Sequence, residues 1–398
     1  MIAHLDADSF FASVLVRKHP HLRGKPLLAV GMGGGCIIAA TYEAKAFGVK
    51  TGMRLSEARK LVPNAIEMPS DFRETGIASS QIESILKDIC PIVEQMSIDE
   101  WFLDLSSLVG GDPDHPEAWA KKTREKILRE TDLSMSIGVA PTKTLSKMAS
   151  EYRKPGGITV VEKRNIEQFL KDRPAGAICG IGRQRSIKTD AAGWITAWDL
   201  ARAPDNSLRA ICGSTGIELK RELLGEQVYT VSKDTRPPKS ISRCRAFRAT
   251  ADRDLVKAHL LKHLEYCIMK MRRDSLACRE ISVWLRTGDY DGSYARRRLH
   301  DPCTNTSQLV PAALSALEEL LKASRRYTQV GLALHGLRST DVMQQSLFDD
   351  TKKSNNEEHL QKAIDTLHMR FGRDSVTRGA ALSVRSGTKK ELDLMFIE

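Results

Sequence analysis

Two apolar runs, each interrupted by acidic residues, constrain what this chain folds into. The first, residues 1–11, reads as a buried strand that contains Asp6. The second, residues 91–105, resumes its apolar pattern after Asp99 and Glu100, which predicts a β-hairpin with these two acids at its tip. Carboxylates among apolar residues are unfavourable unless a cation neutralises them, and oxygen ligands suit Mg²⁺ or Mn²⁺. On spacing alone, a strand-end cap and a solvated turn explain the acids equally well.

The basic residues are concentrated in one segment. The 398-residue chain has a net charge of +11, and residues 236–338 alone contain 20 Lys and Arg against 10 Asp and Glu. Such a concentration is typical of a surface that binds a phosphate backbone, although a solvated face is the alternative. With 41% hydrophobic and 28% charged residues, the chain is long enough for several compact globular units.

The sequence argues against several classes of protein. Its eight cysteines are scattered without a C-x-x-C pair, so neither a structural zinc site nor a disulfide framework is expected. It contains no run of about 18 apolar residues, and its N-terminus lacks a charged lead followed by an apolar core. We therefore expect a cytoplasmic protein with reduced thiols.

Five motifs carry a resemblance to a known family. They are DADSFFAS at 6–13, ATYEAKAFGV at 40–49, SIDE at 97–100, SIGVAPTKTLSKMAS at 136–150 and KPGG at 154–157. In this order and spacing they resemble the signatures of the Y-family (translesion) DNA polymerases, most closely the bacterial DinB and UmuC branches. The resemblance covers at least residues 1–350. It implies a template-directed DNA polymerase that adds dNTPs to a primer 3′-OH with low fidelity and copies past damaged bases.

The resemblance also implies a multidomain α/β (α+β) fold, the right-hand polymerase. Its expected parts are a palm at 1–9 and 71–160, fingers at 10–70, a thumb with a helix-hairpin-helix at 161–230, a linker at 231–241, a little finger at 242–338 and a polar tail at 339–398. The glycine cluster at 31–35 lacks the G-K-[ST] ending of a P-loop and predicts a hairpin turn. The patterns further predict strands at 240–247, 280–286 and 329–335, and helices at 255–273, 311–324 and 356–370.

The resemblance assigns the reaction to three acids. Asp6 and Asp99 would bridge two Mg²⁺ ions, for which Mn²⁺ is a possible substitute, and Glu100 would hold the ion that activates the primer hydroxyl. The carbonyl of Ala7 would complete the site that holds the triphosphate. We expect Asp8 to be structural.

A second set of residues would bind the incoming nucleotide: Phe10, Phe11, Tyr42, Lys45 and Lys154. Phe11 stands at the position of the steric gate, which collides with a ribose 2′-hydroxyl, whereas an aromatic residue in an apolar run is otherwise a core residue. Tyr42, Lys45 and Lys154 occupy the family's phosphate-contacting positions. Most members have Arg where Lys45 stands. Lysine offers a point charge in place of the bidentate fork of arginine. Alternatively, Lys45 is a solvated helix residue. Trp101 is a further departure, at a position where relatives often have a small residue.

The remaining predictions concern macromolecular partners. Primer–template DNA would be contacted by Gly180, Gly182, Arg243, Arg245, Arg248, Arg286, Arg296, Arg297 and Arg298. Gln344, Leu347 and Phe348 resemble the bacterial peptide that binds the ring-shaped sliding clamp, and the UmuC branch adds the possibility of an UmuD-like accessory subunit. A non-catalytic DNA-binding protein that retains the fold is the alternative function. A nucleotide cyclase with a similar palm would leave the thumb-like hairpin and the basic segment unexplained.

Overall fold

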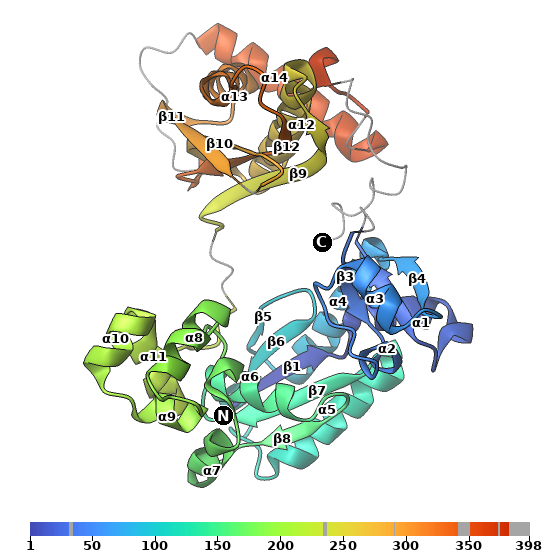
Figure 1. Cartoon of the computed structure of the whole chain (residues 1–398), viewed down its shortest axis with the longest axis vertical. Coiled ribbons are helices and arrows are strands. Elements are labelled where there is room, and N and C mark those ends of the chain that lie inside the picture. Colours follow the sequence, from blue (N-terminus) through green and yellow to red (C-terminus); the bar gives the residue numbers. More distant parts are fainter. Residues whose placement is uncertain (32–34, 234–236, 290, 341–350, 373–374, 382–398) are drawn as a thin grey trace. The chain divides into compact units, whose positions relative to one another are not determined.

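The computed structural model describes residues 1–31, 35–233, 237–289, 291–340, 351–372 and 375–381, with no side-chain description for 351–358. The chain divides into two compact units, residues 1–235 and residues 236–396, each of which is described by itself (Figure 1). None of the described helices is long and apolar enough to cross a membrane.

The first unit is built on a sheet with the strand order β5-β6-β1-β7-β8. The strands are β1 (Ile2–Ala7), β5 (Val93–Gln95), β6 (Glu100–Asp104), β7 (Met135–Ala140) and β8 (Ile158–Val160). Strands β5 and β6 pair antiparallel, with Val93 opposite Leu103. The predicted hairpin with acids near its tip is therefore confirmed, and β6 places that tip beside the central strand β1.

Helices cover the two faces of this sheet differently. Helices α4 (Phe72–Ile89) and α5 (Pro116–Thr131) pack on the face that presents Leu5 and Ile137. Helix α6 (Lys143–Tyr152) lies against β7 and β1 on the other face, where His4 and Asp6 point by strand alternation. Gly138 makes this close contact possible, because a Cβ there would lie 2.1 Å from the backbone oxygen of Ser146.

A smaller sheet of order β3-β2-β4 comprises β2 (Leu27–Val30), β3 (Ile37–Ala40) and β4 (Ile66–Pro69). Helices α1 (Phe10–Lys18), α2 (Tyr42–Lys45) and α3 (Leu55–Leu61) accompany it. Strands β2 and β3 are antiparallel neighbours on either side of the glycine cluster, so the predicted hairpin is confirmed, although residues 32–34 lie outside the described part.

The expected strand over residues 1–11 is wrong beyond Ala7. The backbone of Ser9 turns into the left-handed region with φ 48°, and α1 begins at the next residue, Phe10. The apolar run misled because a buried strand and the buried start of a helix have the same composition when they are short.

Short helices follow, as expected: α7 (Ile166–Lys171), α8 (Arg183–Ala191), α9 (Ala197–Arg202), α10 (Asp205–Cys212) and α11 (Ser214–Leu223). Glu222 joins them to the main sheet. Its fully buried carboxylate accepts hydrogen bonds from the backbone N–H of Thr144 at 3.0 Å, Val228 at 2.7 Å and Tyr229 at 2.9 Å. One side chain thus satisfies donors at the start of α6 and in the chain that leaves α11.

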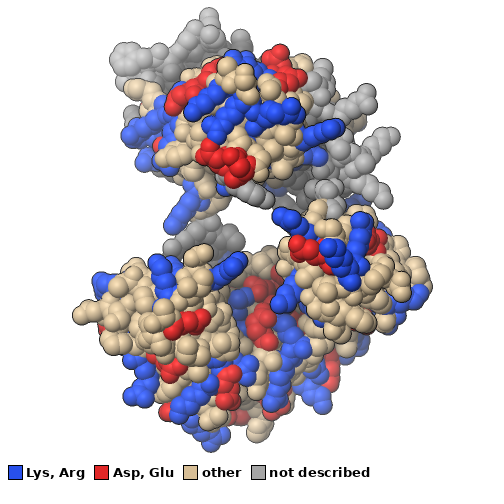
Figure 2. Space-filling view, viewed as in Figure 1, with Lys and Arg blue, Asp and Glu red and all other residues tan. Residues whose placement is uncertain are grey.

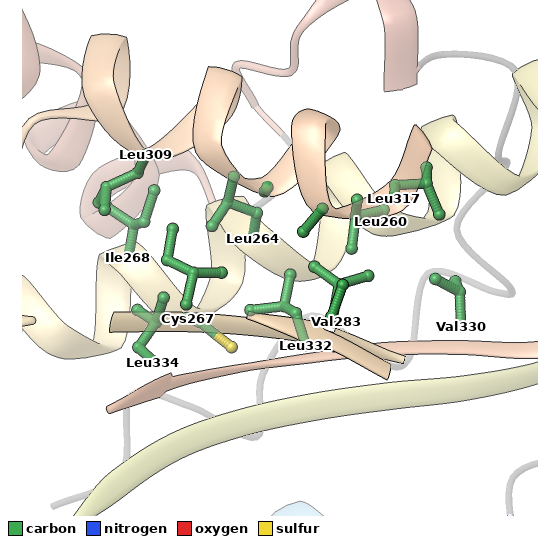
Figure 3. Packing of buried hydrophobic residues seen from close by; sticks show 14 of the residues in the cluster. Leu260, Leu264, Cys267, Ile268, Val283, Leu309, Leu317, Val330, Leu332 and Leu334 are labelled. Atoms are coloured by element: carbon green, nitrogen blue, oxygen red, sulfur yellow. The ribbon is translucent and has the colours of Figure 1, made fainter. Parts of the chain in front are cut away.

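The second unit is a sheet of order β11-β10-β12-β9, packed on helices α12 (Arg253–Arg273) and α13 (Thr306–Leu320). Its strands are β9 (Ser240–Thr250), β10 (Leu276–Arg286), β11 (Gly292–Cys303), β12 (Tyr327–His335) and the short β13 (Arg338–Ser339), which pairs with β10. Figure 3 shows Leu260 and Leu264 of α12 and Leu309 and Leu317 of α13 above Val283 and Leu332 of the sheet.

Two predictions for this unit need correction. Strand β11 was not expected, because an arginine-rich edge strand lacks a clear apolar alternation. Helix α13 starts at Thr306 and contains Pro311, where the prediction placed the start of the helix.

The segment expected as a polar tail is partly folded. Helix α14 (Thr351–Phe371) is longer than the predicted helix at 356–370, and a 3-10 turn (Gly379–Ala381) follows it. Asp365 pairs with Arg272 of α12 at 2.9 Å, and Gln361 accepts a hydrogen bond from Thr306 at 2.8 Å. The predicted clamp-binding residues Gln344, Leu347 and Phe348 lie outside the described residues.

Candidate active site

Strand register brings two of the predicted catalytic acids together. Asp6 lies at the end of β1 directly opposite Glu100, the first residue of β6. The backbone N–H of Ala7 donates to the carbonyl oxygen of Asp99 at 2.9 Å, which fixes the hairpin tip against β1. Acids about 90 residues apart in sequence therefore meet because two strands are neighbours in one sheet.

Three carboxylates of the described residues lie close together. Single oxygen atoms of Asp6, Glu100 and Glu151 all lie within 4.8 Å of one another, an arrangement that could hold a metal ion. Asp99 is not part of this group, and its Oδ1 accepts a hydrogen bond from the Ser97 hydroxyl at 2.5 Å. Sequence analysis missed Glu151, whose available signal was its place on the helix that leads into Lys154.

Lysine side chains neutralise these acids. The ammonium of Lys154 lies 2.6 Å from Oδ1 of Asp6 and 2.9 Å from Oε1 of Glu151. Lys147 of α6 forms an ion pair with Oε1 of Glu100. Pairing of this kind is what a buried or half-buried carboxylate requires.

Burial dominates the electrostatics of Asp6. It raises the pKa of this carboxyl to about 7, although the neighbouring Lys154 ammonium acts in the opposite direction. For Lys154 burial lowers the pKa, but Asp6 and Glu151 outweigh it, so the net pKa is raised. The site is thus one in which a carboxylate needs cations to remain charged, and its hard oxygen donors fit Mg²⁺ or Mn²⁺.

Asp8 has the structural surroundings expected for it. Its buried carboxylate accepts hydrogen bonds from the hydroxyls of Ser134 and Ser136, both at 2.7 Å, and from the backbone N–H of Gly156 at 2.8 Å. These bonds tie the end of β1 to β7 and to the loop after α6. The loop that carries Lys154 is therefore anchored beside the acids.

The predicted phosphate contacts gather next to this loop. The Tyr42 hydroxyl lies 3.4 Å from Oδ1 of Asp8, and the Lys45 ammonium lies 4.4 Å from the centre of the Tyr42 ring. Burial, followed by the charge of Lys154, lowers the pKa of Lys45. Lys45 is therefore half-buried beside another cation, which argues against the solvated-helix interpretation.

The two adjacent phenylalanines at the start of α1 differ. Phe10 is 2% exposed and belongs to the core beneath the main sheet, so the predicted nucleotide contact does not fit its side chain. Phe11 is partly exposed and packs edge-on against Phe72, with ring centroids 5.4 Å apart. Of the pair, only Phe11 has a partly exposed side chain.

The sheet of the second unit separates the predicted DNA-binding arginines. Strand alternation and register put Arg248, Arg286, Arg296 and Arg298 on the face away from α12 and α13, together with Trp284 and the 67% exposed Tyr294. Arg243 stacks on Tyr266 of α12, and Arg297 pairs with Glu319 of α13 at 2.8 Å. With Arg245, they lie on the helical side.

Two further features concern DNA binding: the basic side chains on the second unit and the glycines before α8. Figure 2 shows Lys and Arg side chains spread over the second unit. In the first unit, Gly180 has a φ of 97° and Gly182 precedes α8, so both lie at the turn where backbone N–H groups of a helix start are presented.

The first unit has acids at the ends of neighbouring strands with a lysine loop beside them, and the second unit is basic. These features are those of the right-hand class of DNA polymerases. Residues 5–151 match the impB/mucB/samB family, and residues 238–347 match the C-terminal domain of that family. DNA polymerase IV of Xanthomonas oryzae is 33% identical over 353 residues, which are 88% of this chain and 98% of the relative.

Solved structures agree. A Y-family DNA polymerase chimera of Dbh and Dpo4 matches with a TM-score of 0.74 and 26% identity, over 85% of this chain and 99% of the other. An insertion ternary complex of Dbh DNA polymerase matches with a TM-score of 0.61 and 25% identity, over 85% and 99%. The chain belongs to the impB/mucB/samB family and is a DinB/UmuC-like, Y-family DNA polymerase of the translesion type.

Proposed function

We propose that Asp6, Asp99 and Glu100 are the metal ligands with which this polymerase adds a dNTP to a primer 3′-OH. The observation that supports this most is the direct register pairing of Asp6 with Glu100, with Asp99 fixed against Ala7. Two Mg²⁺ ions, or Mn²⁺ in their place, would activate the primer hydroxyl and stabilise the charge that develops on the leaving pyrophosphate. The Ala7 carbonyl would serve as an additional ligand.

The chain's own residues would orient the nucleotide. Tyr42, Lys45 and Lys154 would contact the β- and γ-phosphates, since all three lie around the buried Asp6 and Asp8. Phe11 would exclude a ribose 2′-hydroxyl. Phosphate oxygens are strong acceptors for charged donors, so the two lysines would supply most of the affinity for the triphosphate.

The fold would divide as the sequence suggests: palm at 1–9 and 71–160, fingers at 10–70, thumb at 161–230, linker at 231–241 and little finger at 242–338. We assign duplex contacts of the little finger to the open-face arginines Arg248, Arg286, Arg296 and Arg298, because they lie on the face away from α12 and α13, whereas Arg243 and Arg297 contact those helices. Arg296 also pairs with Glu280 on the same open face at 3.6 Å. Gly180 and Gly182 would bring α8 close to a DNA phosphate.

Two protein partners belong to the same proposal. Gln344, Leu347 and Phe348 would bind a sliding clamp, and burial of the Leu-Phe pair contributes roughly 1.5–3 kcal/mol per side chain before the cost of ordering. An UmuD-like subunit is a second candidate partner. The protein would act in the cytoplasm, on DNA of the nucleoid.

Primer extension tests the activity. The full chain is given a primer–template with an undamaged or an abasic template base, each with Mg²⁺, Mn²⁺ or EDTA. We expect extension on both templates that stops with EDTA; binding without any extension would support the non-catalytic alternative. The clamp is tested by titrating it with wild type and with the Leu347→Ala, Phe348→Ala double variant, and equal affinities would refute the assigned peptide.

A further inference from the structure

Helix α6 and the loop that follows it present lysines to acids on three different strands. Lys143 lies 2.6 Å from Oε1 of Glu94 on β5, and Lys147 pairs with Glu100 at the start of β6. Lys154, just after the helix, lies 2.6 Å from Asp6 on β1. Only the second and third pairs involve members of the three-carboxylate group.

The position of Lys147 is fixed by its backbone. A Cβ on Gly138 of β7 would lie 2.1 Å from the oxygen of Ser146 and 2.3 Å from the nitrogen of Ser150, so α6 rests directly on the sheet. The Ser150 hydroxyl is also 2.7 Å from Nδ1 of the buried His4. Helix α6 therefore packs directly on the sheet, in a position from which Lys147 reaches Glu100, and both of these side chains are about one-fifth exposed.

Charges in the site nearly cancel. When all three carboxylates are ionised, Asp6, Glu100 and Glu151 contribute −3, and the ammonium groups of Lys147 and Lys154 contribute +2, which leaves −1. A divalent cation that binds Glu100 therefore meets a fixed ammonium on the same carboxylate. Like charges at such separation repel, whereas a triphosphate brings additional negative charge.

We propose that Lys147 is a positioning residue that competes with a divalent cation for the Glu100 carboxylate, so that the metal binds weakly alone and tightly together with a nucleoside triphosphate. This inference rests on the proposed function of Glu100 as a metal ligand. By linkage, whatever the nucleotide adds to metal affinity, the metal adds to nucleotide affinity.

The test measures Mn²⁺ binding to the full chain by electron paramagnetic resonance, with and without a dNTP. We expect Lys147→Met to tighten Mn²⁺ binding about tenfold without nucleotide, because it removes a competing charge while keeping a side chain of similar volume. The matched control Lys143→Met removes a lysine of the same helix that pairs outside the acidic group, and its Mn²⁺ affinity should equal that of wild type. Lys147→Arg keeps the positive charge, so its Mn²⁺ binding without nucleotide should remain as weak as that of wild type.

The further dNTP-dependent gain in affinity should be smaller in Lys147→Met than in wild type. Lys147→Gln is measured alongside, and circular dichroism checks the folding of both variants. Mn²⁺ affinity in folded Lys147→Met and Lys147→Gln that equals or falls below wild type would overturn the proposal. If wild type and Glu100→Gln bind Mn²⁺ equally well under every condition, the proposed metal role of Glu100 fails instead.

Discussion

The Lys154 ammonium lies between Oδ1 of Asp6 at 2.6 Å and Oε1 of Glu151 at 2.9 Å. It thus connects the end of β1 to the end of α6, at the point where we place the triphosphate. One cation serves two purposes here: it neutralises a buried acid, and it provides a donor for phosphate.

Replacing Lys154 should therefore weaken nucleotide binding more than DNA binding. For Lys154→Met we expect KM for dNTP to rise about 10- to 100-fold, since a hydrogen bond from a charged donor is worth roughly 1.5–3 kcal/mol. Steady-state single-nucleotide insertion measures this. Lys171→Met, which removes an exposed lysine paired with Glu167, is the control and should leave KM unchanged. Equal KM values for Lys154→Met and wild type would remove Lys154 from the phosphate site.

Phe11→Ala should admit ribonucleotides. The Phe11 ring is partly exposed whereas the Phe10 ring is buried, so removal of the Phe11 ring should raise the ratio of rNTP to dNTP incorporation. Competition assays with both nucleotides measure the ratio. The variant also lacks the packing against Phe72, which costs up to about 3 kcal/mol of stability, so thermal unfolding is recorded in parallel. An unchanged ratio in a folded variant would leave Phe11 as a packing residue.

The two faces of the second sheet should contribute differently to DNA affinity. Every arginine–phosphate interaction that a substitution removes should reduce the slope of log K against log salt by about 0.9 on duplex DNA. Changing Arg248, Arg286 and Arg298 to Ala together should flatten this slope. The matched set of three from the helical side is Arg243, Arg245 and Arg297, each changed to Ala. Fluorescence anisotropy at several salt concentrations compares them. A larger change in the second set would invert the assignment.

Acid should destabilise the second unit through two buried histidines. Burial, followed by the charge of Arg245 and Arg243 respectively, lowers the pKa of His259 to about 4 and that of His263 to about 3. Both stay neutral in the folded unit at pH 5, whereas in the unfolded chain their pKa is about 6.5. The unfolded state then binds more protons, so stability falls as the pH drops from about 6.5 toward 4.

The expected decrease in stability between pH 7 and pH 5 is about 2 kcal/mol per histidine, or on the order of 4 kcal/mol for the two together. Urea titrations with hydrogen exchange of α12 peptides measure it in the full chain. A His259→Gln, His263→Leu variant should be less sensitive to pH over this range than wild type, and His300→Gln, whose side chain is 97% exposed, should behave like wild type. Identical pH dependence in all three proteins would contradict the assignment.

The identity of most acids in the site could be predicted from the sequence, whereas their arrangement in space could not. The strand patterns placed Asp6 and Glu100 at strand ends, the resemblance to the Y-family polymerases assigned them as metal ligands, and the structure shows them as direct neighbours in register. Glu151 was missed because an acid on an amphipathic helix is indistinguishable from a solvated one until the helix is placed on the sheet. The sheet face on which each arginine of β9 and β11 lies could not be predicted from the sequence either. The register of strand pairing decides which alternate side chains face the helices.

Primer extension by Asp99→Ala and Glu100→Ala tests the central claim most directly. Both acids lie at the hairpin tip, whereas the open-face arginines belong to the other unit, so the variants should retain primer–template affinity within a few-fold. We predict that the extension rate of each variant with Mg²⁺ falls by at least about 10³-fold, as expected when a metal ligand of a phosphoryl-transfer site is removed. Extension by either variant at close to the wild-type rate would contradict the two-metal assignment.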